Sequence, residues 1–440
     1  MSIYSCIYLF LAIVIILIVA FQHLDMLSVA AVCFVVYSIY CIPGIGISGF
    51  YRPHLSSKLY GFVYLQMIII IFVLLKRTSE QMAEQGISHL KKHLVTKEEI
   101  ENVTVTRAYG IYTIIMLLFM LMNVIRIGFD VFAAGKLLVW EKTDIFYLIS
   151  LYGAFPSFAY GIRYHKYWMA ISGLLIELTI FFAGSRAFLA TMMIILLCEW
   201  GYRLWKQNKS SLRVYLIGAL AILFLLIYRA IDVYIMKGDI SGALNVLKQP
   251  ETWAKALEFN EPRVIIANYD YALTTNMKLP LADVIYRIVD FIPGITKIVP
   301  FKLTYPEYYS TWLQEAVHGS EGVGGTIWGE SYSMFGILGI PVITIVWLSV
   351  VSLCNRHIMM PRKGSPFLIA AGVYLAWYIN RLDYNRVGQV VKVMLFCYLL
   401  WAGIYLVLGG VLEWKKRRVI LNNRQIMSQE NYQNQHYVRE

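Results

Sequence analysis

Charged residues are scarce in this chain. Of its 440 residues, 15% are charged and 59% are hydrophobic, and the mean hydropathy is +0.60. Soluble domains have about 25% charged and about 45–50% apolar residues. A water-soluble fold could not bury so much aliphatic and aromatic surface. The composition therefore excludes an ordinary soluble domain and predicts an all-α, polytopic membrane protein.

The sequence also lacks cysteine pairs and several familiar catalytic motifs. Its six cysteines lie almost entirely in hydrophobic runs and form no CxxC pair, which argues against a disulfide framework or a cysteine metal site. There is no P-loop, no HExxH, no GxSxG, and no DxD pair in an external loop. We therefore expect no metal and no cofactor. If the chain is an enzyme, its substrate should arrive already activated and within the membrane.

The net charge of +12 reflects membrane topology and does not indicate nucleic-acid binding. The basic residues cluster between hydrophobic segments, as expected when Lys and Arg mark cytoplasmic loops. No aromatic and basic stacking segment supports a nucleic-acid partner. The first hydrophobic run, 3–21, has neither a basic leading region nor a small-residue cleavage site, so we predict a retained helix rather than a signal peptide.

Hydrophobic runs of about 20 residues predict membrane-spanning helices. By this rule we expect about eleven spans, within a range of about 10–13. They cover 3–22, 26–45, 59–75, 108–129, 144–164, 167–184, 187–202, 213–235, 331–353, 366–380 and 390–412.

The charges between these spans predict four regions. Residues 1–235 form an N-terminal transmembrane bundle of about eight helices with a cytoplasmic loop at 76–107, and 236–330 form one large periplasmic loop. Residues 331–412 return to the membrane, and 413–440 form a cytoplasmic tail that we expect to be disordered from Asn422 onward. The N-terminus then lies on the same side as the large loop.

The large loop is the only long polar stretch of the chain. Within it, Asp283, Arg287 and Asp290 alternate with apolar residues at helical spacing, and Pro293-Gly294 follows. This pattern predicts an amphipathic helix on the membrane surface that ends at the Pro-Gly pair. Such a helix would present Arg287 to a lipid headgroup or to a lipid-linked substrate.

Five arginines are predicted near the external face, where short loops normally avoid them: Arg126, Arg186, Arg229, Arg381 and Arg386. One interpretation is a basic cavity for an anion such as pyrophosphate, which guanidinium groups bind with paired hydrogen bonds. The alternative is snorkelling to headgroups or local pairing, for example Arg126 with Asp130 and Arg229 with Asp232.

Two short segments carry the stronger arginine candidates. Arg186 stands in a tight turn, Gly184-Ser185-Arg186-Ala187, with no acid near it in sequence, and Glu177 on the preceding helix could pair with an arginine from another span. Arg381 and Arg386 flank Asp383, which can satisfy one of them.

The end of the large loop supplies further candidates. His318 has a side chain suited to general-base catalysis, although an ordinary surface histidine is an equally good interpretation. Glu330 is a second candidate base, or a residue that stabilises a helix N-terminus. Trp328 and Tyr332 could stack on sugar rings, or could belong to an interfacial aromatic belt.

Several motifs together resemble a known family. They are Ala183-Gly184-Ser185-Arg186-Ala187, the single late loop, and the run from Gly324-Gly325-Thr326-Ile327-Trp328-Gly329-Glu330 to Gly339. The chain is similar in these features to bacterial oligosaccharide repeat-unit polymerases, the Wzy-type O-antigen or capsule polymerases. The segments Glu261-Pro262-Arg263, Asn268-Tyr269-Asp270 and Asp290-Phe291-Ile292-Pro293-Gly294 are similar to the enterobacterial common antigen branch.

The resemblance implies a multi-pass protein of the bacterial inner membrane with a GT-C-like fold and a cytoplasmic C-terminus. Its substrate would be an undecaprenyl-pyrophosphate-linked oligosaccharide, transferred on the periplasmic face without metal or nucleotide. Membrane lipids, a Wzz-type chain-length regulator and a Wzx-type flippase are the partners it implies.

The resemblance and the chemistry together suggest a role for each candidate residue. Pyrophosphate would be held by three arginines, the acceptor hydroxyl would be activated by one of two bases, and sugars or the headgroup would be bound by the remaining residues. These sets are Arg186, Arg381 and Arg386; His318 or Glu330; and Arg263, Arg287, Asp290, Trp328 and Tyr332. The family's fixed arginine–glycine spacing is not present around Arg287, which puts its role in doubt.

Other functions compete with polymerisation. An O-antigen ligase would use the same donor with a lipid A-core acceptor. A lipid-linked oligosaccharide flippase or other transporter would be expected to show paired halves and short loops, and this chain has no halves and one long loop. A non-enzymatic membrane assembly factor is a further alternative.

Overall fold

The computed structural model describes residues 2–22, 24–42, 55–91, 103–128, 139, 142–182, 185–207, 209, 213–218, 220, 231, 234, 239–249, 261–299, 301–316 and 324–437. Within these ranges the side chains of 79–91, 240, 243, 261, 297 and 412–437 are not described. The described residues form helices and their connections, with no strand among them. The prediction of an all-α chain is confirmed for this part of the protein.

The first half of the chain contains the helices α1 (Ile3–Phe21), α2 (Met26–Ser38), η1 (Ile39–Cys41), α3 (Ser57–Lys91), α4 (Val103–Ile127), α7 (Ile145–Arg163), α8 (Tyr167–Phe182) and α9 (Ala187–Lys206). Aspartates begin two of them, because the side chains of Asp25 and Asp144 accept hydrogen bonds from first-turn amides of α2 and α7.

The second half contains short helices followed by long ones: α11 (Ile240–Leu247), α13 (Glu261–Thr275), α14 (Leu281–Val289), α15 (Ile295–Ile298), α16 (Tyr309–Ala316), α17 (Ile327–Phe335), η3 (Gly336–Leu338), α18 (Gly339–Met359), α19 (Ser365–Tyr378), η4 (Ile379–Arg381) and α20 (Tyr384–Tyr437). The predicted helix after Leu281 and its break at Pro293-Gly294 are both present as α14 and the turn before α15.

Seven helical segments among the described residues are long and apolar enough to cross a membrane. They are α1, the first part of α3, α4, α7, α9, the α17–α18 run and α20 up to Val411. Two shorter apolar helices, Met26–Cys41 and Tyr167–Phe182, accompany them. The predicted span at 366–380 is the 14-residue helix α19, and the predicted span at 213–235 lies largely outside the described residues.

Two helix boundaries differ from prediction. The span expected from 331 is bent, because Gly336 takes a positive φ of 64° between α17 and α18, a conformation that glycine adopts without steric cost. The C-terminal tail was expected to be disordered, but α20 continues as a helix to Tyr437. The tail contains no proline or glycine after Gly410, so nothing in its backbone interrupts a helix started in the membrane.

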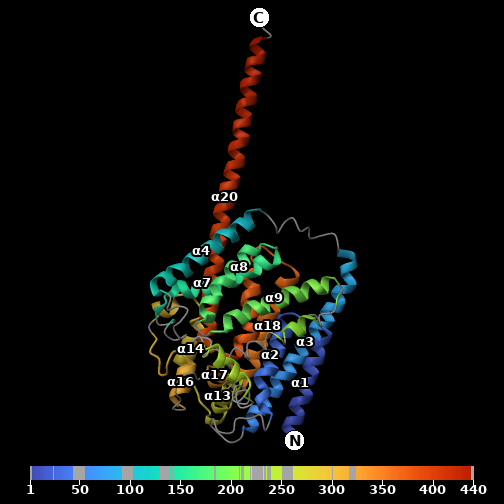
Figure 1. Ribbon diagram of the computed structural model, residues 1–440, viewed down its shortest axis with the longest axis vertical. Helices are drawn as coiled ribbons and strands as arrows, with labels where there is room; N and C mark the ends of the chain where they lie inside the picture. The colour runs from blue at the N-terminus through green and yellow to red at the C-terminus, as the bar shows by residue number, and fades with distance from the viewer. Residues whose placement is uncertain are drawn as a thin grey trace.

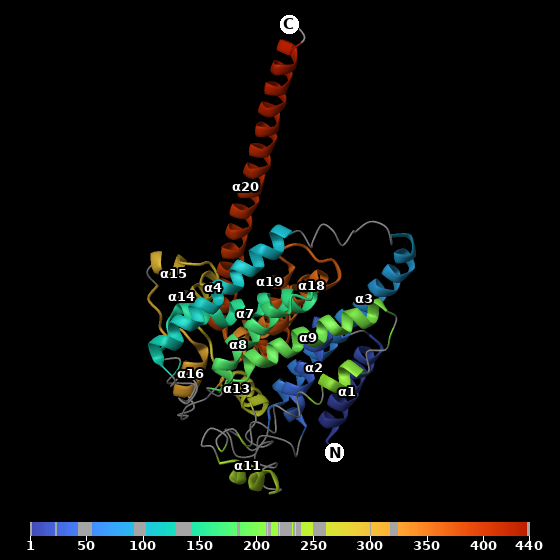
Figure 2. The same cartoon turned by 45° about the horizontal axis from the view of Figure 1, so that its top comes forward.

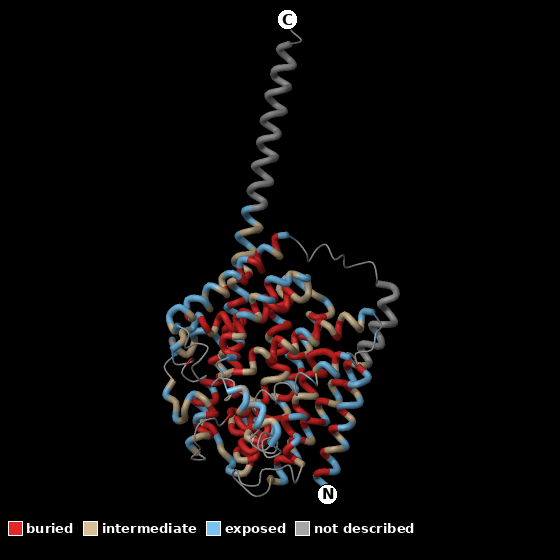
Figure 3. Tube along the Cα trace, in the orientation of Figure 1, coloured by how far each residue is buried: buried red, intermediate tan, exposed pale blue. Residues whose placement is uncertain are grey.

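The helices form one bundle with a buried, mainly apolar interior (Figures 1 and 3). In Figure 1 the N-terminus lies at the same end as α13, α16 and α17, and the C-terminal part of α20 projects from the opposite end. We refer to the first of these ends as the site end. Exposed side chains on α1, α4 and α20 are mainly large and apolar, as expected of helices that face lipid.

Candidate functional site

The site end is built by α13, α16, α17, η4 and the start of α20. Hydrogen bonds join these elements: Asn268 Nδ2 of α13 donates to Gly324 O at 2.6 Å, and Trp328 Nε1 of α17 donates to Asn380 Oδ1 at 3.0 Å. Ser310 of α16 donates from both its amide and its hydroxyl to Asp383 Oδ2. Hydrogen bonds therefore hold segments that are far apart in sequence around the junction of η4 and α20.

Arg381 and Asp383 face the glycine pair that precedes α17. Arg381 is half-buried, and its guanidinium lies 5.8 Å from the ring centroid of Tyr378. A Cβ at Gly324 would contact the Arg381 side chain, and a Cβ at Gly325 would lie only 3.2 Å from Asp383 atoms. The absence of a side chain at Gly325 thus lets the loop approach Asp383 closely.

Arg386 is half-buried, with 43% of its side chain accessible. Its guanidinium lies 5.8 Å from the ring centroid of Tyr308, and its Nη2 donates to Ser310 Oγ at 3.4 Å. Asp383 Oδ2 lies 3.9 Å from Arg386 Nε, as the sequence suggested when it placed an acid between the two arginines. This arrangement leaves one face of a fixed guanidinium open.

Tyr308 forms the wall beside Arg386. Its hydroxyl accepts a hydrogen bond from Gln389 Nε2. Burial raises the pKa of Tyr308, although the Gln389 contact and the nearby Arg386 lower it. The phenol therefore stays neutral near pH 7 and offers an aromatic face beside a cation.

Arg186 reaches the same end of the bundle from α9. It is the residue at which α9 begins, and α9 packs along α19, where Trp377 Nε1 donates to Thr191 Oγ1 at 3.0 Å. Arg186 stands five residues before Thr191, about 8 Å along α9 at a rise of 1.5 Å per residue, and Arg381 stands four residues after Trp377.

A row of aromatic rings runs from the start of α9 to the ring that Arg381 contacts. We call Phe188, Tyr152, Tyr374 and Tyr378 the aromatic floor. Consecutive ring centroids lie 5.3 Å (Phe188 to Tyr152), 5.4 Å (Tyr152 to Tyr374) and 5.3 Å (Tyr374 to Tyr378) apart. The row begins at Phe188, two residues after Arg186, and ends at Tyr378, the ring that Arg381 contacts, so it links the start of α9 to η4 through packed rings.

Arg287 and Glu330 occupy the interior instead of the surface. Both side chains are 0% exposed, and Arg287 Nε donates to Glu330 Oε1 at 2.7 Å. Arg287 also donates to the carbonyls of Asp283 and Pro306, and Glu330 Oε2 accepts from the Tyr384 amide at 2.7 Å. The Arg287 guanidinium therefore does not face headgroups as predicted, because the carboxylate of Glu330 draws it into the protein.

The remaining predicted residues are buried in the protein interior at the site end. Asp290 accepts two hydrogen bonds of 2.9 Å from Lys392 Nζ of α20. Arg263, Trp328 and Tyr332 are all buried. The indole of Trp328 packs edge-on against Phe34 and Trp347, so its ring belongs to the core and does not form an open sugar platform.

Some predicted features lie elsewhere. His318, Asp130, Arg229 and Asp232 are outside the described residues. Arg126, for which Asp130 was the suggested partner, contacts Asp144 instead, with Nη1 3.2 Å from Oδ2. The carboxyl group of Asp144, 18 residues away in sequence, was not foreseen as a partner because local spacing gives no sign of a contact between two helices.

Three polar residues of this site were not predicted: Asn268, Ser310 and Gln389. Each donates a hydrogen bond that positions another part of the site. Asn268 donates to the Gly324 carbonyl, Ser310 to Asp383 and Gln389 to the Tyr308 hydroxyl. The signal available in sequence was weak, because single Asn, Ser and Gln residues in polar or helical segments have many uses.

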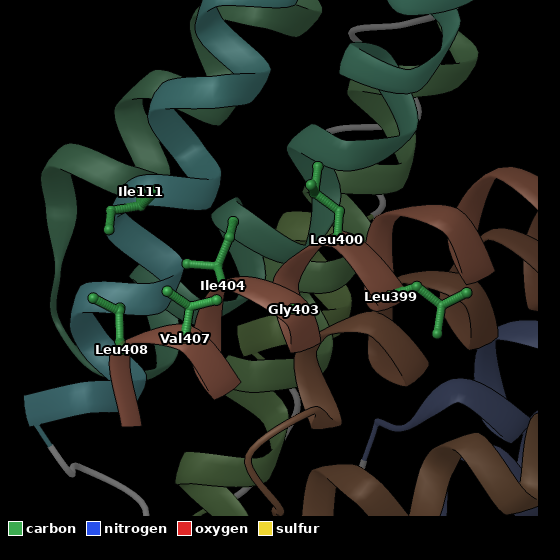
Figure 4. A pocket seen from close by; sticks show the side chains of 7 residues that line it. All are labelled: Ile111, Leu399, Leu400, Gly403, Ile404, Val407 and Leu408. Atoms are coloured by element: carbon green, nitrogen blue, oxygen red, sulfur yellow. The ribbon is translucent and has the colours of Figure 1, made fainter. Parts of the chain in front are cut away.

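An apolar groove lies far from these residues. It has a volume of about 480 Å³ and is lined by Ile111 of α4 and by residues of α20 between Leu399 and Leu408 (Figure 4). Leu399 stands thirteen residues beyond Arg386, about 20 Å along the helix. Its lining carries no ionisable group, so the groove suits only an apolar chain.

The described part of the chain is all-helical, with segments long and apolar enough for a multi-pass membrane protein, and one group of buried polar side chains lies at the site end. Among the described residues no three His, Cys, Asp or Glu side chains gather to hold a metal ion. A scan against models of known protein families found no match, and searches of curated proteins and of solved structures found none either.

Proposed function

We propose that the chain polymerises oligosaccharide repeat units carried on undecaprenyl pyrophosphate, acting as a glycosyltransferase at the outer face of a bacterial inner membrane. The observation that carries the proposal is the placement of Arg381 and Arg386 around Asp383 and the Gly324-Gly325 loop in a bundle of membrane-type helices, and Arg186, at the start of α9, is proposed to join them. The motif resemblance supports the same function. A Wzx-type flippase and a Wzz-type regulator are the proposed partners, and the C-terminus is proposed to be cytoplasmic.

The arginines suit the leaving group of this reaction. The acceptor hydroxyl oxygen forms a bond to the anomeric carbon of the donor chain, the bond from that carbon to the pyrophosphate oxygen breaks, and the lipid pyrophosphate departs with the bonding electrons. Guanidinium groups held in place can stabilise the charge that develops on the pyrophosphate. The open face of Arg386 offers a direct contact, and Arg381 stands on Tyr378 of the aromatic floor.

The acceptor proton needs a base. Glu330 is fully engaged by Arg287 and the Tyr384 amide, which favours a role in holding the start of α20 over proton transfer. His318 therefore remains the proposed base. Tyr308, with its ring beside Arg386, takes the role of sugar platform in place of Trp328, which is enclosed in the core.

A deletion strain tests the function. A gel of surface glycolipids would be compared with that of the parent strain. Single repeat units on each acceptor, with the ladder of longer chains gone, are expected. Loss of even the single-unit band would instead identify a ligase, a flippase or an earlier step. An unchanged ladder would refute a role in the polymer altogether.

Point variants test the site. Arg386→Ala and Arg381→Ala should each restore little or no ladder to the deletion strain, with expression at the parent's level, because removing one positioned donor typically costs about 10²–10³ in rate. Arg126→Ala is the matched control, since its side chain is 58% exposed and contacts only Asp144 in the described structure. A full ladder from Arg386→Ala would remove this residue from the proposal.

A further inference from the structure

The helix α14 has its polarity reversed relative to a helix that covers a soluble core. Its charged residues point inward: Asp283 and Arg287 are 0% exposed and Asp290 is 4% exposed. Its apolar residues point outward, with exposures of 73% for Leu281 and 48% for Ile288. A helix in water would show the opposite pattern.

The inward charges are all engaged, so the orientation of α14 is well determined. Asp283 accepts hydrogen bonds of 3.0 Å from the amides of Thr304 and Tyr305. Arg287 holds Glu330 and Asp290 holds Lys392. Rolling α14 to bury its apolar face would break all of these contacts and leave several charges without partners.

The outward residues form one continuous stripe. Leu281, Ile285 and Ile288 follow one another at intervals of four and three residues, the spacing of a single helix face, and Ile292 follows, exposed, in the turn after the helix. The stripe continues past the turn to Ile298, which is 78% exposed.

The contacts of α14 with α20 indicate how deep α14 lies relative to the membrane. Asp290 lies against Gly388, where a Cβ would be 3.4 Å from its carboxylate, and it accepts from Lys392. These positions are four and eight residues into an apolar span that starts at Tyr384, about 6 and 12 Å along the helix. In Figures 1 and 2, α14 lies at the periphery of the bundle, and it packs against α20.

The part of α20 that contacts α14 also exposes apolar side chains. Val391 and Leu395, one turn from the residues that contact Asp290, are exposed on α20. We infer that α14 and α15 are inserted into the outer leaflet of the bilayer, with lipid acyl chains covering Leu281, Ile285, Ile288 and Ile292 while the charged face seals against the protein.

The insertion has a consequence for the site. Arg287 of α14 holds Glu330, and Glu330 accepts from the first amide of α20, two residues before Arg386. One wall of the site is thus anchored on a helix that bilayer lipid supports. This inference concerns the lipid contact alone and stands whether or not the proposed polymerase activity is found.

Accessibility of a nitroxide spin label tests the inference directly. A cysteine would replace Ile288, with Ile285 as a second position, in full-length chain carrying Cys6→Ser and reconstituted in phosphatidylglycerol–phosphatidylethanolamine vesicles. Native thiols other than Cys6 are buried or half-buried, and the parent without an added cysteine gives the background. Thr275, exposed at the end of α13, serves as the water-facing control, and Leu399, 57% exposed on α20, as the lipid-facing control.

Labels at 288 and 285 should collide more with oxygen, which concentrates in the bilayer, than with a water-soluble nickel chelate, as at Leu399. A label at Thr275 should show the reverse. A profile at 288 and 285 that matches Thr275 would overturn the insertion by placing the stripe in water. Labels shielded from both reagents would also overturn it, because a protein surface such as a second copy would then cover the stripe.

Discussion

Replacing Arg287 by Met should lower the free energy of unfolding by about 3–5 kcal/mol, because it leaves a buried carboxylate without its counter-charge. Met is close to arginine in length and fills the space with little change in packing. The prediction applies equally to Glu330→Gln, which removes the charge from the other side of the pair.

The structure supplies the magnitude. Both side chains are 0% exposed and Nε lies 2.7 Å from Oε1. At about 4 Å between charge centres, the attraction is about 4 kcal/mol for an effective dielectric constant of about 20. Arg287→Met also leaves the carbonyls of Asp283 and Pro306 without these donors, and a lost partner for a buried polar group costs about 1–3 kcal/mol.

Reversible unfolding in mixed detergent micelles would measure the effect, with the two single variants, the double variant and the parent compared in one cycle. The double variant should be less destabilised than the sum of the singles by about 1–3 kcal/mol, since the partners act on each other. The matched control is Arg126→Met, which removes an exposed arginine whose ion pair should be worth about 1 kcal/mol or less.

Two results would refute this reasoning. An Arg287→Met protein within about 1 kcal/mol of the parent would mean that the guanidinium is not needed to neutralise Glu330. Additive single effects would mean that the two residues do not interact, whatever their separation.

Three further sets of substitutions test the helix packing, a helix cap and a buried acid. Gly161→Ala should destabilise the bundle in thermal unfolding, because a Cβ there would lie 2.5 Å from a backbone nitrogen of α8, whereas Gly61→Ala, with nothing within 4 Å, should be neutral or stabilising by up to about 1 kcal/mol. If the two variants melt alike, the close approach of α7 and α8 is wrong. Asp144→Ala should cost about 1 kcal/mol as a lost helix cap, seen as a lower melting temperature, and a wild-type value would argue against the cap. Glu177→Met should raise stability by about 1–3 kcal/mol, because both carboxyl oxygens are buried without a hydrogen-bond partner in the described structure. Loss of ladder formation with that gain in stability would instead assign Glu177 a function.

The composition and the hydrophobic runs were enough to predict an all-helical membrane chain and the approximate positions of most described helices. Long apolar segments have few alternatives, since backbone polar groups in lipid must bond within their own helix. The same reasoning placed the helix after Leu281, because its apolar and charged residues alternate at helical spacing, and it placed the break at Pro293-Gly294.

The direction in which that helix faces could not be predicted from its sequence. Periodicity shows that α14 has two faces, but the burial of the charged face depends on Glu330 and Lys392, which are 43 and 102 residues away from their partners. The assembly of the site also depends on contacts between residues that are far apart in sequence. The helices that carry Arg186 and Arg381 pack together through the contact of Trp377 with Thr191, and Asp383 is held by Ser310 from a distant loop helix. Residue type and spacing determined which side chains could bind an anion. Tertiary packing decided which of them share a surface, because contacts between distant segments leave no periodic trace in the chain.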